Sequence, residues 1–252
     1  MKQLIYIVAF LLSGLLYAQN SQVFEEANAL YNNANYTEAL EKYNTILETE
    51  VHSAELYYNI ANAHYKLNHI APSIYYYEKA LLLKPNDKDI KNNIAFARNM
   101  TVDAIDTVPE VGLTKLIKNV TNLMGFDAWG KTAIILVICF VLLFISYYFT
   151  YSTAKKRIAF VSSLACLMLA LIALAFAFHK FQLVKKDQPA IVFAQEAKIK
   201  SEPNLRSTES FILHEGTKVQ VLDTVDNWKK IKLSDGKTGW VMNDDIRILK
   251  TF

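Results

Sequence analysis

The stretch TAIILVICFVLLFISYYFTYSTA, residues 132–154, carries no charged side chain. The triplet KKR at 155–157 separates it from a second uncharged run, IAFVSSLACLMLALIALAFAF, residues 158–178. A helix that crosses the roughly 30 Å hydrocarbon layer of a membrane needs about 20 such residues, and a soluble core helix rarely continues so long without a polar face. The two runs therefore predict transmembrane helices at 132–151 and 158–178, joined by the short loop 152–157.

The N-terminus predicts export of the chain. Residues 1–18 combine Lys2 with an apolar run that ends in Leu-Tyr-Ala before Gln19, which is typical of a secretory signal peptide. An uncleaved membrane anchor is the alternative. Either interpretation places the N- and C-terminal domains outside the cytoplasm and the loop 152–157 inside it. The charges support this orientation only weakly, because lysines also flank the outer ends of the spans.

Composition excludes several classes of function. The 27 basic and 24 acidic residues give a net charge of +3, and the positive excess lies beside the predicted spans, so no surface suited to nucleic acid is expected. Both cysteines, Cys139 and Cys166, lie within the spans, and the five histidines show no metal-binding spacing. The seven glycines form no phosphate loop. We therefore expect no catalytic residues, no metal, no cofactor and no enzymatic activity.

Residues 21–100 repeat with a period of 34, which is the signature of the tetratricopeptide repeat. Small side chains at equivalent positions would let paired helices approach closely, and a recurring tyrosine would fill the gap between neighbours. Pro85 ends the second unit, and Asp87–Met100 would form a helix that covers the open end of the array. The sequence thus predicts an all-α solenoid of two repeats plus a capping helix. The recurring pairs are Ala27 and Ala61, Ala39 and Ser73, Tyr43 and Tyr77, and Leu47 and Leu81.

The first helix of each repeat carries the candidate binding residues. An aromatic–Asn–Tyr pattern at i, i+4 and i+7 would provide amides for a peptide backbone and rings for apolar contact. A C-terminal carboxylate fits less well, because Phe24, Asp89 and Asn93 occupy positions where carboxylate-binding repeats carry cations. The alternative is that these residues merely pack within the array. The candidate peptide-binding groove comprises Phe24, Asn28, Tyr31, Tyr58, Asn59, Asn62 and Tyr65.

Residues 101–131 combine a linker with an amphipathic helix beside the first span. Leu116, Ile117 and Val120 share one helical face, which predicts a helix in the lipid headgroup region; packing against the repeats is the alternative. In the second span, a stripe of small residues would admit the first span closely. The members of this stripe are Ser162, Cys166, Ala170, Ala173 and Ala177.

Short alternating strands dominate residues 189–250, and Asp235-Gly236 forms a predicted hairpin turn. The segments LHEGTKVQVL, NWKKIKL and DGKTGWV resemble the bacterial SH3 domain, a small all-β barrel of five to six strands. The interpretation places Trp240, which follows Gly239 in a family-like motif, in the core. Trp228 breaks the alternation set by Ile231 and is the candidate surface residue of this domain.

The order of signal, repeats, two spans and SH3-like domain resembles the BatE family of the Bacteroidetes aerotolerance gene cluster. The resemblance covers essentially the whole chain. It implies a multidomain inner-membrane protein of a Gram-negative bacterium, with both soluble domains in the periplasm. It also implies partnership with other Bat-type membrane proteins, which resemble von Willebrand factor A-domain proteins.

Two functions fit these features. The first is a non-enzymatic scaffold, in which the repeats bind a partner protein and the hairpin anchors the assembly in the membrane. The alternative is a cell-wall or ligand sensor, in which the SH3-like domain contacts peptidoglycan and the repeats transmit its occupancy.

Overall fold

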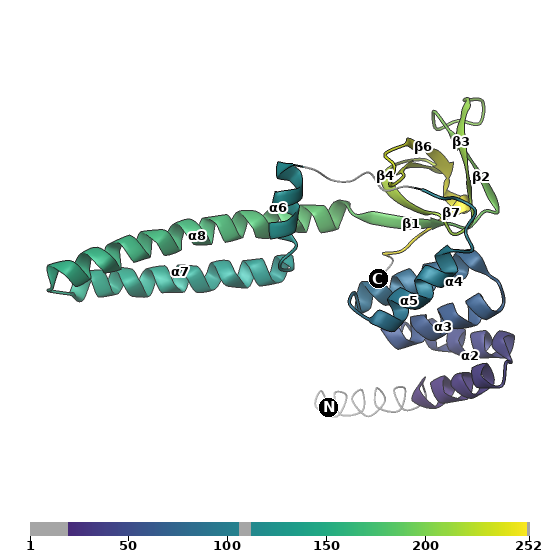
Figure 1. Ribbon diagram of the computed structural model, residues 1–252, viewed down its shortest axis with the longest axis horizontal. Helices are drawn as coiled ribbons and strands as arrows, with labels where there is room; N and C mark the ends of the chain where they lie inside the picture. Colours follow the sequence, from purple (N-terminus) through teal and green to yellow (C-terminus); the bar gives the residue numbers. More distant parts are fainter. Residues whose placement is uncertain (1–19, 106–111, 251–252) are drawn as a thin grey trace, which may run out of the picture. The chain divides into compact units, whose positions relative to one another are not determined.

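The computed structural model describes residues 20–105 and 112–250. The predicted signal peptide, residues 1–18, lies outside the described residues. The chain forms two compact units, and the first joins residues 20–105 to residues 188–250 although the hairpin separates them in sequence. The second unit comprises residues 112–187. We call residues 20–98 the repeat domain, residues 188–250 the sheet domain, and α7 with α8 the helical hairpin (Figure 1).

The repeat domain is a stack of antiparallel helices. Ser53 caps α3 by accepting a hydrogen bond from Leu56 N at 3.1 Å, and Asp87 caps α5 in the same way. The turn inside each repeat uses a left-handed residue at the equivalent position, Ala34 (φ 63°) and Asn68 (φ 60°). The helices are residues 20–32, α2 (Tyr36–Glu48), α3 (Ala54–Lys66), α4 (Ile70–Leu83) and α5 (Lys88–Arg98).

The packing of the array follows the 34-residue period. Ala27 and Ala61 are fully buried, as are Ala39 and Ser73, where the helices of each pair meet. The Ser73 hydroxyl donates to the carbonyl of Ala61 at 3.1 Å, so this small polar residue is satisfied inside the core. Tyr43 and Tyr77 are buried between neighbouring helices. The structure thus contains two helix pairs, followed by α5.

The sheet domain contains one antiparallel sheet of seven strands, in the order β3-β2-β6-β5-β4-β1-β7. The sequence predicted a barrel of five to six strands, but this sheet is not closed: β3 and β7 are its edges. Gly236, in the predicted turn, has φ 94° and connects β5 to β6. The strands are β1 (Gln188–Val192), β2 (Glu196–Lys200), β3 (Glu209–His214), β4 (Lys218–Val225), β5 (Trp228–Lys232), β6 (Thr238–Met242) and β7 (Ile246–Ile248).

The prediction that Trp240 lies in the core of the sheet domain is wrong. Gly239 and Val241 are buried, whereas Trp240 between them is partly exposed. Adjacent strand residues face opposite sides of a sheet, so Trp240 lies on the outer face. The glycine of the Gly-Trp motif has a steric role, because a Cβ atom at Gly239 would lie 2.3 Å from Ile199 Cγ2. The absence of a side chain at Gly239 therefore lets β6 approach β2 closely.

The sheet domain packs against α4 of the repeat domain. Ile191 and Leu249 are fully buried in one hydrophobic cluster with Tyr57, Ile74 and Tyr77. At Gly216 (φ 85°), which precedes β4, a Cβ atom would lie 2.8 to 3.1 Å from side-chain atoms of Thr101, Ile74 and Ile70. This glycine provides both the backbone conformation and the close approach. The two domains therefore share a core.

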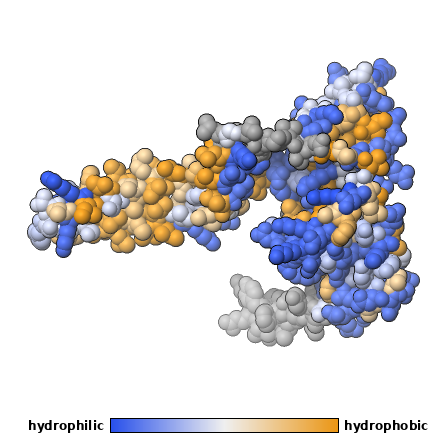
Figure 2. Space-filling model, viewed as in Figure 1, coloured by the Kyte–Doolittle hydropathy of each residue, from blue (hydrophilic) through white to orange (hydrophobic). Residues whose placement is uncertain are grey.

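The second unit contains α6 (Leu113–Thr121), α7 (Phe126–Phe149) and α8 (Thr153–Lys186). Helices α7 and α8 are long and apolar enough to cross a membrane. Helix α7 begins before the predicted span 132–151 and ends within it, at Phe149. Helix α8 extends beyond the predicted span 158–178 at both ends and includes most of the predicted loop 152–157, so the turn between the helices is shorter than predicted. Figure 2 shows apolar residues over most of the hairpin and hydrophilic residues at its turn.

Small residues of α8 line its contact with α7. The buried residues are Ala159, Ser163, Ala170 and Ala173. Ser163 is buried in place of Ser162, which the sequence analysis had assigned to the stripe and which is partly buried together with Cys166 and Ala177. The buried positions recur alternately every three and four residues, counting Cys166, which is typical of helices that pack in a left-handed pair.

Candidate functional site

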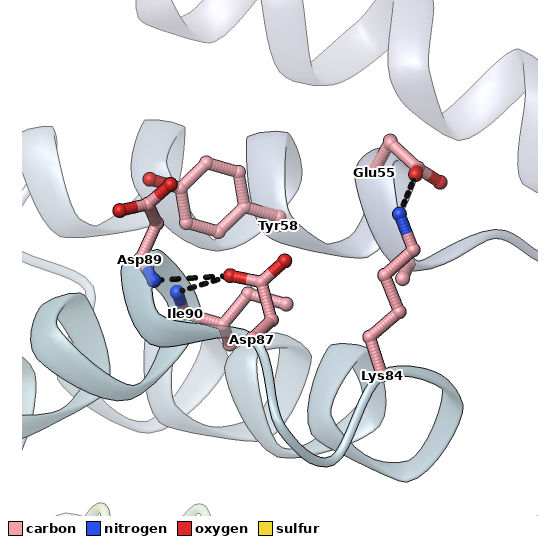
Figure 3. Close-up of a pocket in the computed structure, with 7 residues that line it drawn as sticks. Glu55, Tyr58, Lys84, Asp87, Asp89 and Ile90 are labelled. Atoms are coloured by element: carbon pink, nitrogen blue, oxygen red, sulfur yellow. Dashed lines mark hydrogen bonds and ion pairs between the residues drawn. The ribbon is translucent and has the colours of Figure 1, made fainter.

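Two pockets open on the face formed by helix 20–32, α3 and α5, which we call the first-helix face. The larger has a volume of about 320 Å³. The smaller, of about 80 Å³, lies where α3 meets the start of α5 (Figure 3). The larger pocket is lined by Glu25, Asn28, Tyr31, Asn32, Tyr43 and Asn59. The smaller is lined by Ala54, Glu55, Tyr58, Lys84, Asp87, Asp89 and Ile90.

A hydrogen-bond network at the larger pocket fixes the position of Asn28. Its Oδ1 accepts a hydrogen bond from the Tyr43 hydroxyl at 2.7 Å and another from Asn59 Nδ2 at 2.8 Å. Burial raises the pKa of Tyr43 to about 12, so the phenol remains a donor at neutral pH. Asn59 belongs to the next repeat, and the network therefore joins the two repeats along the first-helix face.

The same network recurs 34 residues later. Asn62 Oδ1 accepts from the Tyr77 hydroxyl at 2.5 Å and from Asn93 Nδ2 at 3.1 Å. Asn93 also donates to the Tyr58 hydroxyl at 2.8 Å. Burial raises the pKa of Tyr77. Both asparagine side-chain carbonyls are thus occupied by partners inside the array.

The structure distributes the predicted groove residues along this face. Asn28, Tyr31 and Asn59 line the larger pocket. Tyr58 lines the smaller one. Phe24 contacts the Tyr43 ring, with centroids 5.8 Å apart, and lines a third pocket at the start of the array.

Asn62 and Tyr65 contribute mainly to packing. The two hydrogen bonds that Asn62 accepts tie α3 to α4 and α5. Tyr65 is partly buried against the cluster that contains Ile74 and Tyr77. Of the seven predicted residues, some therefore line pockets and others pack within the array.

The charges on the first-helix face are mostly negative. The two pockets are lined by four carboxylates, of Glu25, Glu55, Asp87 and Asp89, and by one ammonium group, of Lys84. Lys84 forms an ion pair with Glu55, and Asp87 accepts hydrogen bonds from Asp89 N and Ile90 N (Figure 3). Glu25 and Asp89 are exposed. A cationic ligand therefore suits this face better than an anionic one.

Sequence reasoning missed part of this face. It assigned Tyr43 and Tyr77 to packing alone, although their hydroxyls hold the asparagines. The available signal was their spacing, because each tyrosine follows its asparagine by 15 residues in both repeats. It also missed the acidic residues Glu25 and Glu55 as lining residues.

A second candidate surface lies on the outer face of the sheet domain. Trp228, the predicted surface residue, is partly exposed and pairs with Met242, while Lys230 pairs with Trp240. Lys230 Nζ lies 5.9 Å from the centre of the Trp240 ring. Residues paired across strands share a face, so β5 and β6 present two indoles beside a lysine.

No group of three or more His, Cys, Asp and Glu residues positioned to hold a metal ion occurs among the residues that the structure describes. His64 and His69 are close, with Nδ1 atoms 3.2 Å apart, but this pair has no third ligand of that kind. Burial and the neighbouring charges of His69 and Arg247 lower the pKa of His64 to about 4.

Comparison with known proteins identifies two modules. Residues 54–87 match the tetratricopeptide repeat, and residues 196–247 match the bacterial SH3 domain. No curated protein matches the chain significantly. Both modules are typically binding domains without catalytic activity. The chain therefore combines two modules that suit protein or peptidoglycan binding with two helices that are able to span a membrane.

Proposed function

We propose that the protein is a non-enzymatic membrane scaffold whose first-helix face binds an extended segment of a partner protein. The repeated Tyr–Asn–Asn network carries this proposal. It holds side chains of successive repeats in fixed positions beside open pockets, as a preorganised binding surface requires. The sheet domain packs on α4 and leaves these pockets open.

The charges indicate the chemistry of the partner segment. Four carboxylates against one lysine favour a segment that carries Lys or Arg. Partner capture should then weaken as salt concentration rises. Partners of the Bat type, with von Willebrand factor A domains, remain the candidates that the family resemblance suggests.

Site-specific crosslinking in intact membranes tests the scaffold. A photoreactive residue at Asn32, which lines the larger pocket, is expected to capture a partner. The matched control is Thr45, which is exposed on α2 outside both pockets. The paired substitutions Glu25→Gln and Asp89→Asn should reduce capture at Asn32 several-fold. Equal capture from both positions, or no effect of the paired substitutions, would contradict the proposal.

Replacement of Asn28 and Asn62 by Ala is a poorer test. Each substitution removes two hydrogen bonds inside the array, so a loss of binding would be mixed with a loss of stability. The surface carboxylates avoid this problem because Glu25 and Asp89 are exposed.

The proposed location is the bacterial inner membrane, with both soluble domains in the periplasm. Two long apolar helices support it, together with the cations Lys155, Lys156 and Arg157 at the start of α8, beside the turn. A reporter fused after Phe252 should be active only outside the cytoplasm, and a reporter inserted at Ala154 only inside. Cytoplasmic activity of the C-terminal fusion would reject this topology.

The two indoles of the sheet domain favour a second candidate function, a sensor that contacts peptidoglycan. Trp228 and Trp240 lie on one face of adjacent strands. Sedimentation of the full chain with purified cell wall tests it. Binding that Trp228→Ala and Trp240→Ala both reduce would support the sensor. Absence of binding by the unaltered chain would leave the scaffold alone.

A further inference from the structure

Helix α6 lies across the hairpin at the end opposite the α7–α8 turn (Figure 1). Two contacts hold it there. Trp129 Nε1 of α7 donates to the carbonyl of Thr121 at 3.1 Å, and Lys180 Nζ of α8 donates to Asn122 Oδ1 at 2.5 Å. Thr121 is fully buried at this junction. If α7 and α8 cross a membrane, a helix that lies across them is roughly parallel to the membrane plane.

The apolar side of α6 and of the turn that follows it is exposed. Leu116 is 62% exposed and Leu123 is 74% exposed, and Ile117 and Met124 are also exposed. At 100° per residue Leu116 and Ile117 share one arc of α6, and the same spacing continued past Thr121 places Leu123 and Met124 on that arc. Exposed apolar side chains gathered on one arc indicate an interaction surface.

The opposite side of α6 is basic. Lys115 and Lys118 are exposed and share a face with Asn122, since the three positions follow each other by three and four residues. The hydrogen bond to Asn122 brings Lys180 to this same face. Residues 112–131 and 179–187 together hold six lysines and two aspartates. Phosphate groups match this excess of positive charge.

We propose that α6 is an interfacial helix that binds anionic phospholipids. Its apolar arc enters the hydrocarbon layer, and Lys115, Lys118 and Lys180 contact lipid phosphates. Continuity with the apolar hairpin and charge complementarity both favour lipid over a partner protein as the occupant of this surface. The inference rests on the proposed membrane location of α7 and α8.

The depth of α6 is measured on the full chain in lipid nanodiscs. A nitroxide is attached at Ile117→Cys or at Lys118→Cys, each in a Cys139→Ser, Cys166→Ser background. The probe at 117 should collide with oxygen and be shielded from a water-soluble nickel chelate, whereas the probe at 118 should be accessible to nickel. Nickel access at both positions would overturn the proposal and assign the apolar arc to a protein partner.

A third probe separates this result from failure of the spans. A nitroxide on Cys139 of α7, with Cys166→Ser, should be shielded from nickel if α7 crosses the membrane. Shielding there together with nickel access at 117 rejects the interfacial helix and keeps the span. Nickel access at Cys139 rejects the span itself.

Native mass spectrometry of the released chain tests lipid selectivity. The readout is the ratio of phosphatidylglycerol to phosphatidylcholine that remains bound. Lys115→Gln with Lys118→Gln should lower this ratio roughly tenfold, since each lysine near an anionic surface contributes several-fold. Lys88→Gln with Lys91→Gln, an exposed pair at the same spacing in α5, is the control for lost charge.

Two outcomes would contradict the selectivity. Equal ratios in the lysine variant and in the control would show that α6 does not select anionic lipid. Removal of the preference by added inorganic phosphate would show that the lysines bind free phosphate and not a lipid headgroup.

Discussion

The second helices of the two repeats, α2 and α4, occupy equivalent positions but differ on their outward faces. In α2 the outward residues Glu41, Asn44 and Thr45 are exposed. Thirty-four residues later, α4 has Tyr75, Glu78 and Lys79, and all three are buried. The packing residues Tyr43 and Tyr77 are the same in both. The comparison shows that the repeat period determines the inside of the array, whereas the docked domain determines its outside.

Tyr75 and Glu78 on α4 contact the sheet domain directly. The Tyr75 ring lies 5.6 Å from that of Phe193, and its hydroxyl donates to the carbonyl of Ile248 at 3.3 Å. The Glu78 carboxylate bridges Arg98, at 2.6 Å, and Lys218 of the sheet domain, at 2.8 Å. Burial lowers the pKa of Lys79, whose ammonium group lies over the rings of Tyr57 and Tyr75. A buried charge requires such partners.

The largest expected change in stability comes from an exchange of residues between the two repeats. Tyr75→Glu places in α4 the residue that α2 has at this position. It should lower the free energy of unfolding of the first unit by about 3–5 kcal/mol, because a large aromatic is lost and a carboxylate is buried. Hydrogen exchange of the solubilised chain should show lost protection in β1 and α4. Glu41→Tyr, the reverse exchange, should change stability by less than about 0.5 kcal/mol.

A second difference between the repeats, at His64 of α3, predicts a dependence of stability on pH. Its equivalent in the first repeat is Leu30, and it stacks on Tyr76 with centroids 5.7 Å apart. The folded-state pKa of about 4 lies below the ordinary 6.5, so the unfolded chain binds a proton between these values and the folded chain does not. Stability is therefore lost as pH falls from 6.5 towards 4, by up to about 3 kcal/mol.

The variant His64→Leu should remove that loss. Melting temperatures measured at intervals between pH 7 and 4 should fall less for the variant than for the unaltered chain. His179→Leu is the control, because His179 is exposed and belongs to the second unit. Parallel curves for the unaltered chain and His64→Leu would contradict a partly buried histidine that stays neutral in the folded chain.

The segment after α5 contacts the sheet domain through Asp103, and the first repeat has no equivalent contact. The Asp103 carboxylate accepts from His214 N at 2.7 Å, His214 Nδ1 at 2.8 Å and Thr217 Oγ1 at 2.6 Å. Burial alone would raise the pKa of Asp103, but these donors hold it below its ordinary value. Its stabilisation is thus present above about pH 4 and is lost as pH falls through the folded-state pKa.

Asp103→Asn should lower the free energy of unfolding by about 1–3 kcal/mol at neutral pH, as expected for lost hydrogen bonds to a charged group. The difference from the unaltered chain should shrink in acid, where both side chains are neutral. Urea titrations at both pH values measure it. An equal difference at both values would show that the carboxylate charge has no role, and Asp244→Asn, at an exposed site, is the control.

Sequence patterns predicted the local structure well where one helix or one period carries the information. The 34-residue period located the small residues and tyrosines that pack the array, and Asp87 marked the start of α5. Docking of the sheet domain was not predicted, because Asp103 and His214 are 111 residues apart. One signal was present: Tyr75 replaces the charged residue of the first repeat at an outward position.

The sheet domain shows where motif resemblance misleads. Alternation around the buried Val241 requires Trp240 to face outward, but the Gly-Trp motif favoured the core. The sequence predicted five to six strands, whereas the sheet has seven. The 34-residue period led to the candidate groove residues. The acidic lining of the pockets was not predicted, because it depends on which helices meet.

The smallest expected change in stability concerns the tyrosine–asparagine hydrogen bond that both repeats contain. Tyr43 and Tyr77 each donate from a buried hydroxyl to an asparagine, at 2.7 and 2.5 Å. Tyr43→Phe and Tyr77→Phe should therefore each lower the free energy of unfolding by about 1 kcal/mol, since one hydrogen bond is lost and the ring is retained. The two losses should agree although only the second repeat carries the docked domain. A clearly larger loss at Tyr77 would show that docking tightens the interior of its repeat, and that the inside and outside of the array are not independent.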